Sequence, residues 1–415
     1  MQLNELLQRR KLIMVFLIFV FAFLIRITWT YIDHTVNGTS NWADAKLYLK
    51  HGLDFSQGNL YPEIMPEGPL VPMIVALAKV VTGDPIWPVL FLNCLLSSLA
   101  VFVLFRMGER LVHLYAGYVM AFWYAFHHVT MRYNFQILKE PFLLLLLPLL
   151  ILLLIRIHDH KKVALSIVLS SLMFSVLIHT DERYIVYGPF ILAFIILVLK
   201  GRYGLQKAGI WLAILLISMV PWTLRNYKQY GEVVILTPRT TAFTSKLWGT
   251  DIAKLHFSNE ETRQNLTDVF KERAYQAARQ YGVQPRLYGR YERYYKAFIH
   301  YWQPTHFRLT FIQDGFRPVK SSLLSNLNGI FFYGIFLPFY LAGLVLAIVK
   351  RNGLMLFLAI LPLVHSLIHT IMIWPLGRYR FVMDFLVLIV ALWFIKIYFG
   401  RLIHRARLKE DAVVS

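Results

Sequence analysis

The chain has 415 residues, is 57% hydrophobic and only 16% charged, and carries a formal net charge of +20. Soluble domains carry roughly 25% charged residues, so this composition, with a mean hydropathy of +0.53, excludes an ordinary soluble enzyme and indicates a polytopic membrane protein. The single cysteine, Cys94, excludes a disulfide framework and a cysteine-based metal site.

The first apolar run, residues 12–31, follows the basic residues Arg9, Arg10 and Lys11, as in a signal peptide. The apolar core is too long for a typical signal peptide, and no small-residue cleavage site follows it. We therefore expect an uncleaved first membrane helix.

Further apolar runs follow along the chain, and a membrane helix needs about 20 apolar residues to cross roughly 30 Å of hydrocarbon. We expect about ten membrane helices and an all-α fold, with spans near 12–31, 86–106, 112–131, 141–157, 163–180, 184–200, 207–224, 328–350, 353–374 and 381–400. The run 69–82 is too short to cross and contains Pro72 and Lys79. An interfacial or re-entrant helix fits this run better.

The distribution of basic residues predicts the orientation of these spans. If the N-terminus is cytoplasmic, every inner loop is rich in Lys and Arg and the short outer loops are poor in them, as the positive-inside rule demands. The agreement would fail if 69–82 crossed the membrane. Both termini are therefore expected in the cytoplasm, and the positive charge is explained by topology and anionic headgroups rather than by nucleic acid.

Residues 226–327 form a polar stretch, rich in Tyr, Arg and Gln, between the seventh and eighth expected spans. We expect a small, mostly helical outer domain here. The predicted organisation is a transmembrane module, 1–225, with a large first outer loop, 32–85, then this outer domain, then a second transmembrane module with a cytoplasmic tail, 328–415.

Residues with chemical potential gather on the predicted outer side, at or near helix ends. Charges at such positions are costly and suggest function. The carboxylates can take a proton, Lys and Arg can hold a phosphate, and aromatic rings can stack on sugars. The candidate site residues are Asp44, Tyr48, Tyr61, Glu67, Lys139, Glu140, Asp181, Arg183, Arg225, Arg378, Tyr379 and Arg380.

This inventory suits group transfer from a phosphate-linked donor, in which a carboxylate activates a hydroxyl and cations stabilise the departing phosphate. The chain contains neither a Walker A loop nor a Rossmann fingerprint, which argues against a nucleotide-linked donor. A lipid-phosphate donor at the outer leaflet fits better.

Several motifs in order resemble the GT-C superfamily of integral-membrane glycosyltransferases. They are Asp44 with Tyr48 four residues on, "YPEIMPEGPL", a Lys-Glu-Pro helix start, "PWTLRN" and "GRYRFVMDFLVL". The chain is most similar to bacterial relatives of protein O-mannosyltransferases and of the lipid A aminoarabinose transferase.

The resemblance implies inverting transfer from a polyprenyl-phosphate sugar to a hydroxyl on a glycan, lipid or protein, in the bacterial inner membrane. By position, it implies Asp44 as general base and Glu140 as a second acid. The implied candidate phosphate ligands are Lys139, Arg225, Arg378 and Arg380.

Two departures from the family pattern matter. Glu67 and Gly68 replace the usual basic residue before the Pro-Pro-Leu segment, here beginning at Pro69, which leaves the phosphate-binding cation open. The first loop has a lone Asp44 instead of an adjacent Asp-Glu pair, which argues against a protein O-mannosyltransferase proper.

Structural roles are open for the same residues. Asp44 is suited to a helix N-cap, and Glu140 before a helix-starting Pro suits the helix dipole. Residues 181–183 suit a solvated turn that pairs internally. Arg378, Tyr379 and Arg380 suit an interfacial anchor, and Arg225 suits headgroup snorkelling.

The histidines allow a metal-site hypothesis. His365 and His369 share a helix face, and the alternative hypothesis is a metal site that joins outer histidines to Asp44 or Glu140. Such histidines more often satisfy hydrogen bonds in a helix bundle, so we expect no cofactor.

Two functions of other classes remain. A transporter or flippase needs ionisable residues and broken helices near mid-membrane, whereas here the charges sit mainly at helix ends. An envelope-assembly partner without catalytic activity would use residues 226–327 for binding.

Overall fold

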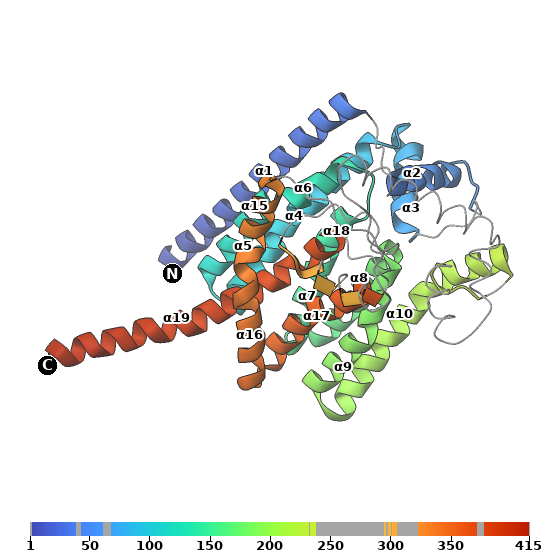
Figure 1. Cartoon of the computed structure of the whole chain (residues 1–415). Helices are drawn as coiled ribbons and strands as arrows, with labels where there is room; N and C mark the ends of the chain where they lie inside the picture. The colour runs from blue at the N-terminus through green and yellow to red at the C-terminus, as the bar shows by residue number, and fades with distance from the viewer. Residues whose placement is uncertain are drawn as a thin grey trace. The chain divides into compact units, whose positions relative to one another are not determined.

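The computed structural model describes residues 2–38, 43–60, 68–231, 233–237, 294–295, 298–299, 301–304, 323–371 and 377–414. Every regular element in these ranges is a helix (Figure 1), and the all-α fold class is confirmed. The chain divides into two compact units, Met1–Val103 with Thr130–Arg263, and Leu104–Val129 with Gln264–Ser415.

Within the described ranges, nine helices are long and apolar enough to cross a membrane. They are Gln8–Val36, Trp87–Leu111, Glu140–His158, Val163–Thr180, Glu182–Leu199, Gly201–Gln229, Leu327–Val349, Gly353–Thr370 and Phe381–Gly400. The remaining expected span, 112–131, consists of two helices, α5 (Leu114–Phe126) and α6 (His128–Arg132), separated by His127 with extended backbone. The 13-residue α5 is too short to cross alone.

In the first unit, α1 (Gln2–Asn37) packs against the first part of α4 (Trp87–Leu111) through aromatic rings. The ring centroids of Phe19 and Phe102 are 5.0 Å apart, and those of Phe23 and Phe91 are 5.6 Å apart. Such pairs bury large apolar surfaces in a preferred geometry, so they fix the first helix on its neighbour.

A helical hairpin of α2 (Ala43–Ser56) and α3 (Leu70–Thr82) follows α1 (Figure 1). The two helices approach so closely that a Cβ on Gly52 would lie 2.4 Å from Val75 Cγ1, so glycine is required there. One face of α3 is buried and the other exposes apolar side chains, including Leu77 and Val81. With 13 residues, α3 is too short to cross a membrane; its interfacial position stays a prediction.

The rest of the first unit is a helical bundle. Its elements are α7 (Glu140–His158), α8 (Val163–Thr180), the short 3₁₀ helix η2 (Glu182–Tyr187), α9 (Gly188–Leu199) and α10 (Gly201–Tyr230). Helix α8 packs against both α7 and α10. Serine hydroxyls join α8 to α10: Ser171 donates to the Trp211 carbonyl at 2.6 Å, and Ser218 donates to Ser175 at 2.7 Å. Small polar residues allow this close helix packing in membranes.

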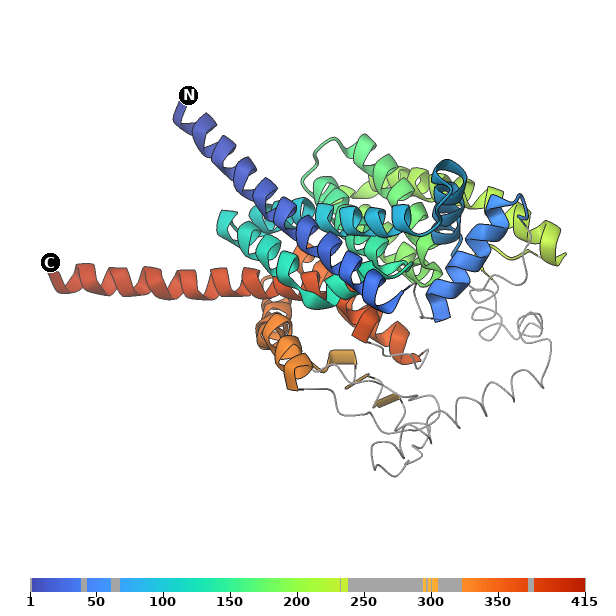
Figure 2. The same cartoon turned by 90° about the horizontal axis from the view of Figure 1, so that it is seen from above.

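The second unit contains α15 (Leu323–Phe332), η4 (Gly334–Phe336), α16 (Leu337–Val349), α17 (Gly353–Ile371), α18 (Gly377–Arg380), η5 (Phe381–Met383) and α19 (Asp384–Val414). Helix α16 packs against the first part of α19, and the second half of α19 extends beyond the other helices of this unit (Figure 2). At the contact, a Cβ on Gly343 would lie 2.8 Å from Val390 Cγ1. The Tyr340 hydroxyl donates to the Ala359 carbonyl at 2.6 Å and joins α16 to α17. Most of the expected outer domain, 226–327, lies outside the described residues, so its existence stays a prediction.

Candidate functional site

Two short polar stretches at helix ends form the candidate site in the first unit. Lys139 precedes α7, which starts at Glu140 and carries Pro141 in its first turn, where a missing N–H costs nothing. Asp181 ends α8 with an extended backbone, and its side chain accepts from the Arg183 N–H, which opens η2. Since α7 packs on α8, the two stretches meet.

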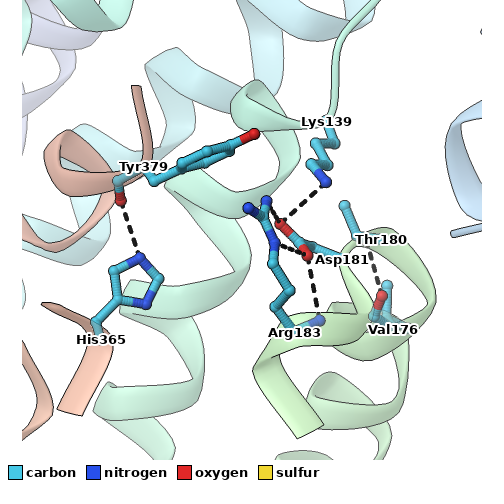
Figure 3. Close-up of polar contacts among 7 residues, drawn as sticks. All are labelled: Lys139, Val176, Thr180, Asp181, Arg183, His365 and Tyr379. Carbon is cyan, nitrogen blue, oxygen red and sulfur yellow. Dashed lines mark hydrogen bonds and ion pairs between the residues drawn. The ribbon is translucent and has the colours of Figure 1, made fainter. Parts of the chain in front are cut away.

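Lys139 and Arg183 converge on one carboxylate (Figure 3). Lys139 Nζ is 3.1 Å from Asp181 Oδ2. Arg183 binds the same carboxylate through two nitrogens, with Nε 2.8 Å from Oδ1 and Nη2 on Oδ2. The side chain of Asp181 is 1% exposed, that of Lys139 6% and that of Arg183 10%. The turn thus pairs internally, but it is buried and not solvated.

The pKa of Asp181 is set by opposing effects. Burial acts to raise the pKa of Asp181, but the charges of Arg183 and Lys139 and their hydrogen bonds outweigh it and hold the pKa well below its usual range. Asp181 is therefore ionised at neutral pH. The stability it contributes is present above its ordinary value of 3.8 and is lost as the pH falls further below it.

Two more carboxylates lie in the same stretches. Glu140 and Glu182 are both buried, and so is Tyr184, which follows Glu182 in the second stretch. Glu182 was not among the predicted site residues. Its signal in the sequence was its position in "HTDERY", directly beside two predicted residues.

Gly68, which lies in the loop shortly before α3, meets this site. A Cβ at Gly68 would lie 2.3 Å from the His179 carbonyl oxygen and 3.0 Å from the Thr180 carbonyl carbon. These are backbone atoms of the last turn of α8, so a larger residue would force that turn away. The close approach places the loop against the turn that ends at Asp181.

Arg225 in α10 binds the same loop. Its Nε donates to the Leu60 carbonyl at 2.9 Å, its Nη1 donates to Asn226 Oδ1 at 2.9 Å, and its guanidinium lies 4.8 Å from the Trp222 ring centroid. These contacts hold the loop on the end of α10. A phosphate-binding role for Arg225 stays a prediction.

Asp44 lies in the first turn of α2, where the helix dipole favours a carboxylate. Its side chain is partly buried, and Tyr48, one turn on, is fully buried. The α2–α3 hairpin reaches the candidate site through α3, which contacts α8. The predicted site residues Tyr61 and Glu67 lie outside the described residues.

The other predicted site residues belong to the second unit. Arg380 is buried: its guanidinium lies 3.9 Å from the Tyr333 ring centroid, its Nε is 3.4 Å from Asp384 Oδ1, and its Nη1 donates to the Gln303 carbonyl. The side chain of Arg378 lies outside the described part. Sequence reasoning did not assign Asp384 to the site, although it closes the quoted motif "GRYRFVMD".

The paired histidines of α17 support α18. His365 Nε2 donates to the Tyr379 carbonyl at 2.9 Å (Figure 3). His369 stacks on the Tyr379 ring with centroids 4.5 Å apart. Both contacts are of the kind expected for histidines that satisfy a helix bundle. Among the described residues, no group of three or more His, Cys, Asp and Glu is placed to hold a metal ion.

Comparison with known proteins supplies two matches. Residues 66–224 match a family described as dolichyl-phosphate-mannose-protein mannosyltransferase. The fold matches the apo form of the Archaeoglobus fulgidus oligosaccharyltransferase, with a TM-score of 0.55 and 14% sequence identity, over 96% of this chain and 52% of that one. This chain therefore spans about half the length of that solved protein. No curated protein matches it.

Proposed function

We propose that this chain transfers a sugar from a polyprenyl-phosphate donor to a hydroxyl acceptor, with inversion, on the outer face of a bacterial inner membrane. The matched family and the matched solved structure both belong to the GT-C superfamily. The matches support a GT-C glycosyltransferase in an integral membrane protein. The name of the matched family specifies a lipid-phosphate sugar as donor. The same class of donor suits a site at the ends of membrane helices.

The observation that carries the proposal is the buried ion group of Lys139, Asp181 and Arg183. Removing charges from water costs free energy, and apolar residues in the same place are often as stabilising as a buried ion pair. A buried ion group of this kind therefore indicates a functional role. Asp181 holds two cations in fixed positions. Cations fixed before the reaction stabilise the negative charge that grows on the departing polyprenyl phosphate, without reorganisation.

The proposed reaction is a single displacement at the anomeric carbon. Asp44 takes the proton of the acceptor hydroxyl as its oxygen bonds to that carbon. The bond from the anomeric carbon to the phosphate oxygen breaks, and its electron pair leaves with polyprenyl phosphate. Attack opposite the leaving group inverts the configuration. Glu140, buried next to Lys139, is the second acid of the site.

A donor comparison tests the proposed function. The purified chain is reconstituted in proteoliposomes and given sugar-labelled polyprenyl phosphates or the matching nucleotide sugars, with envelope lipid and glycan acceptors. We expect label to leave the polyprenyl phosphate and enter an acceptor, and the nucleotide sugars to stay intact. Folded protein that leaves every lipid donor intact would contradict the proposal. Movement of the intact donor across the bilayer would instead indicate a flippase.

A further inference from the structure

Arg26 is a buried cation inside the first apolar span, Gln8–Val36. It departs from the expectation that charges lie at helix ends, and it is 0% exposed. A charge at this depth is costly and marks a functional element by default. The proposed chemistry gives Arg26 no part.

Arg26 joins α1 to the segment that leads to the candidate site. Its Nη1 donates to the Ala22 carbonyl at 3.1 Å, which fixes the side chain along its own helix. Its Nη2 donates to Thr130 Oγ1 at 3.2 Å. Thr130 is buried and opens a stretch, residues 130–136, that we call the 130–136 turn. This turn runs through α6 and the 3₁₀ helix η1 (Tyr133–Phe135), which packs on α1.

The 130–136 turn is held at its other end by α4. Asn93 is fully buried, and its side-chain amide donates to the Gln136 carbonyl at 2.8 Å. Within the turn, the Asn134 amide donates to the Thr130 carbonyl at 3.2 Å. Both ends of the turn are thus tied to neighbouring helices by side-chain hydrogen bonds.

A second contact joins α1 to α4 on the same face of α1. Thr30, one turn after Arg26, has its hydroxyl 3.2 Å from Cys94 Sγ, next to Asn93. Residues four apart lie on one helix face. The polar contacts of Arg26 and Thr30 therefore lie along one face of α1. The same helix leads by a short connection to α2 and Asp44.

We propose that Arg26 is a positioning residue that, together with Asn93, holds the 130–136 turn and thereby places Lys139 against Asp181. Ile137 and Leu138, the two residues between the turn and Lys139, are buried, so a shift of the turn passes directly to Lys139. In addition, Arg26 fixes the position of α1, which leads to Asp44, relative to the segment that carries Lys139. This role in catalysis rests on the proposed function.

The first test does not need a substrate. Amide hydrogen exchange of residues 130–139 is measured in nanodiscs for wild type, Arg26→Met and Thr130→Val. Local opening sets the exchange rate, so we expect exchange about tenfold faster or more in both variants. Thr130→Ser keeps the hydroxyl and should exchange as wild type does. The matched control is Arg106→Met, because the side chain of Arg106 is 54% exposed and pairs with Glu109 one turn along its own helix.

The second test asks whether Arg26 acts through Lys139. We expect Arg26→Met to lower kcat about tenfold or more, and the double variant with Lys139→Met to lose little beyond Lys139→Met alone. Losses that multiply independently would contradict the positioning role. Unchanged exchange in Arg26→Met and Thr130→Val would overturn the proposal outright. If wild type transfers no sugar, the proposed function fails, and exchange alone decides whether Arg26 holds the turn.

Discussion

Replacing Lys139 by Met is expected to lower kcat for sugar transfer by about 10²–10³, the usual effect of removing one fixed donor to a developing anion. The Lys139 ammonium is buried and held by Asp181 at 3.1 Å, so it is already in place when the phosphate departs. Steady-state transfer from the polyprenyl-phosphate donor measures the loss. The fold should survive, because Asp181 keeps its two-nitrogen contact with Arg183.

Two variants control the Lys139 experiment. Lys139→Arg keeps the charge in a different shape and should retain part of the activity. Lys79→Met removes an exposed lysine whose ammonium donates to the Gly83 carbonyl, and it should behave as wild type. Activity of Lys139→Met within about threefold of wild type would remove Lys139 from the phosphate site, since a fixed donor contributes more than that.

In contrast to Lys139→Met, Asp181→Asn is expected to affect folding more strongly than the rate of sugar transfer. The substitution leaves Lys139 and Arg183 buried without the carboxylate that binds both. Removing one partner of a buried ion group costs about 3–5 kcal/mol, a large share of the stability of most proteins. The measurement is the free energy of unfolding in mixed micelles, or the folded fraction after mild heating.

A double variant keeps this prediction testable if Asp181→Asn does not fold. Adding Lys139→Met removes one of the two cations that face the lost carboxylate and should recover part of the lost stability. The matched control is Asp159→Asn, because Asp159 is 30% exposed and pairs with His158 at 3.1 Å; exposed pairs of this kind contribute little. Equal stability of Asp181→Asn and wild type would show that the ion group does not hold the α7–α8 junction.

The membrane helices could be predicted from the sequence because a span leaves a local signal, an apolar run of sufficient length. The expected span 141–157 corresponds to α7, and 163–180 coincides with α8. The break at His127 inside the expected span 112–131 could not be predicted in this way. Hydropathy averaged over a window does not detect one residue with extended backbone.

The candidate site was predictable only as an inventory. Charge at helix ends identified Lys139, Asp181 and Arg183 individually, but their convergence depends on how α7 packs on α8. The partner of Arg26 is likewise invisible in the sequence: Thr130 is an ordinary residue in an apolar run, and only tertiary packing brings its hydroxyl to the guanidinium.

The most direct measurement of the central claim is transfer from a radiolabelled polyprenyl-phosphate sugar by wild type and Asp44→Asn, purified side by side. The substitution keeps the shape of the side chain in the first turn of α2 and removes only the base. We expect transfer by wild type and a loss of at least about 10²-fold in the variant. Transfer that is unchanged in Asp44→Asn would contradict the assignment of Asp44 as the base.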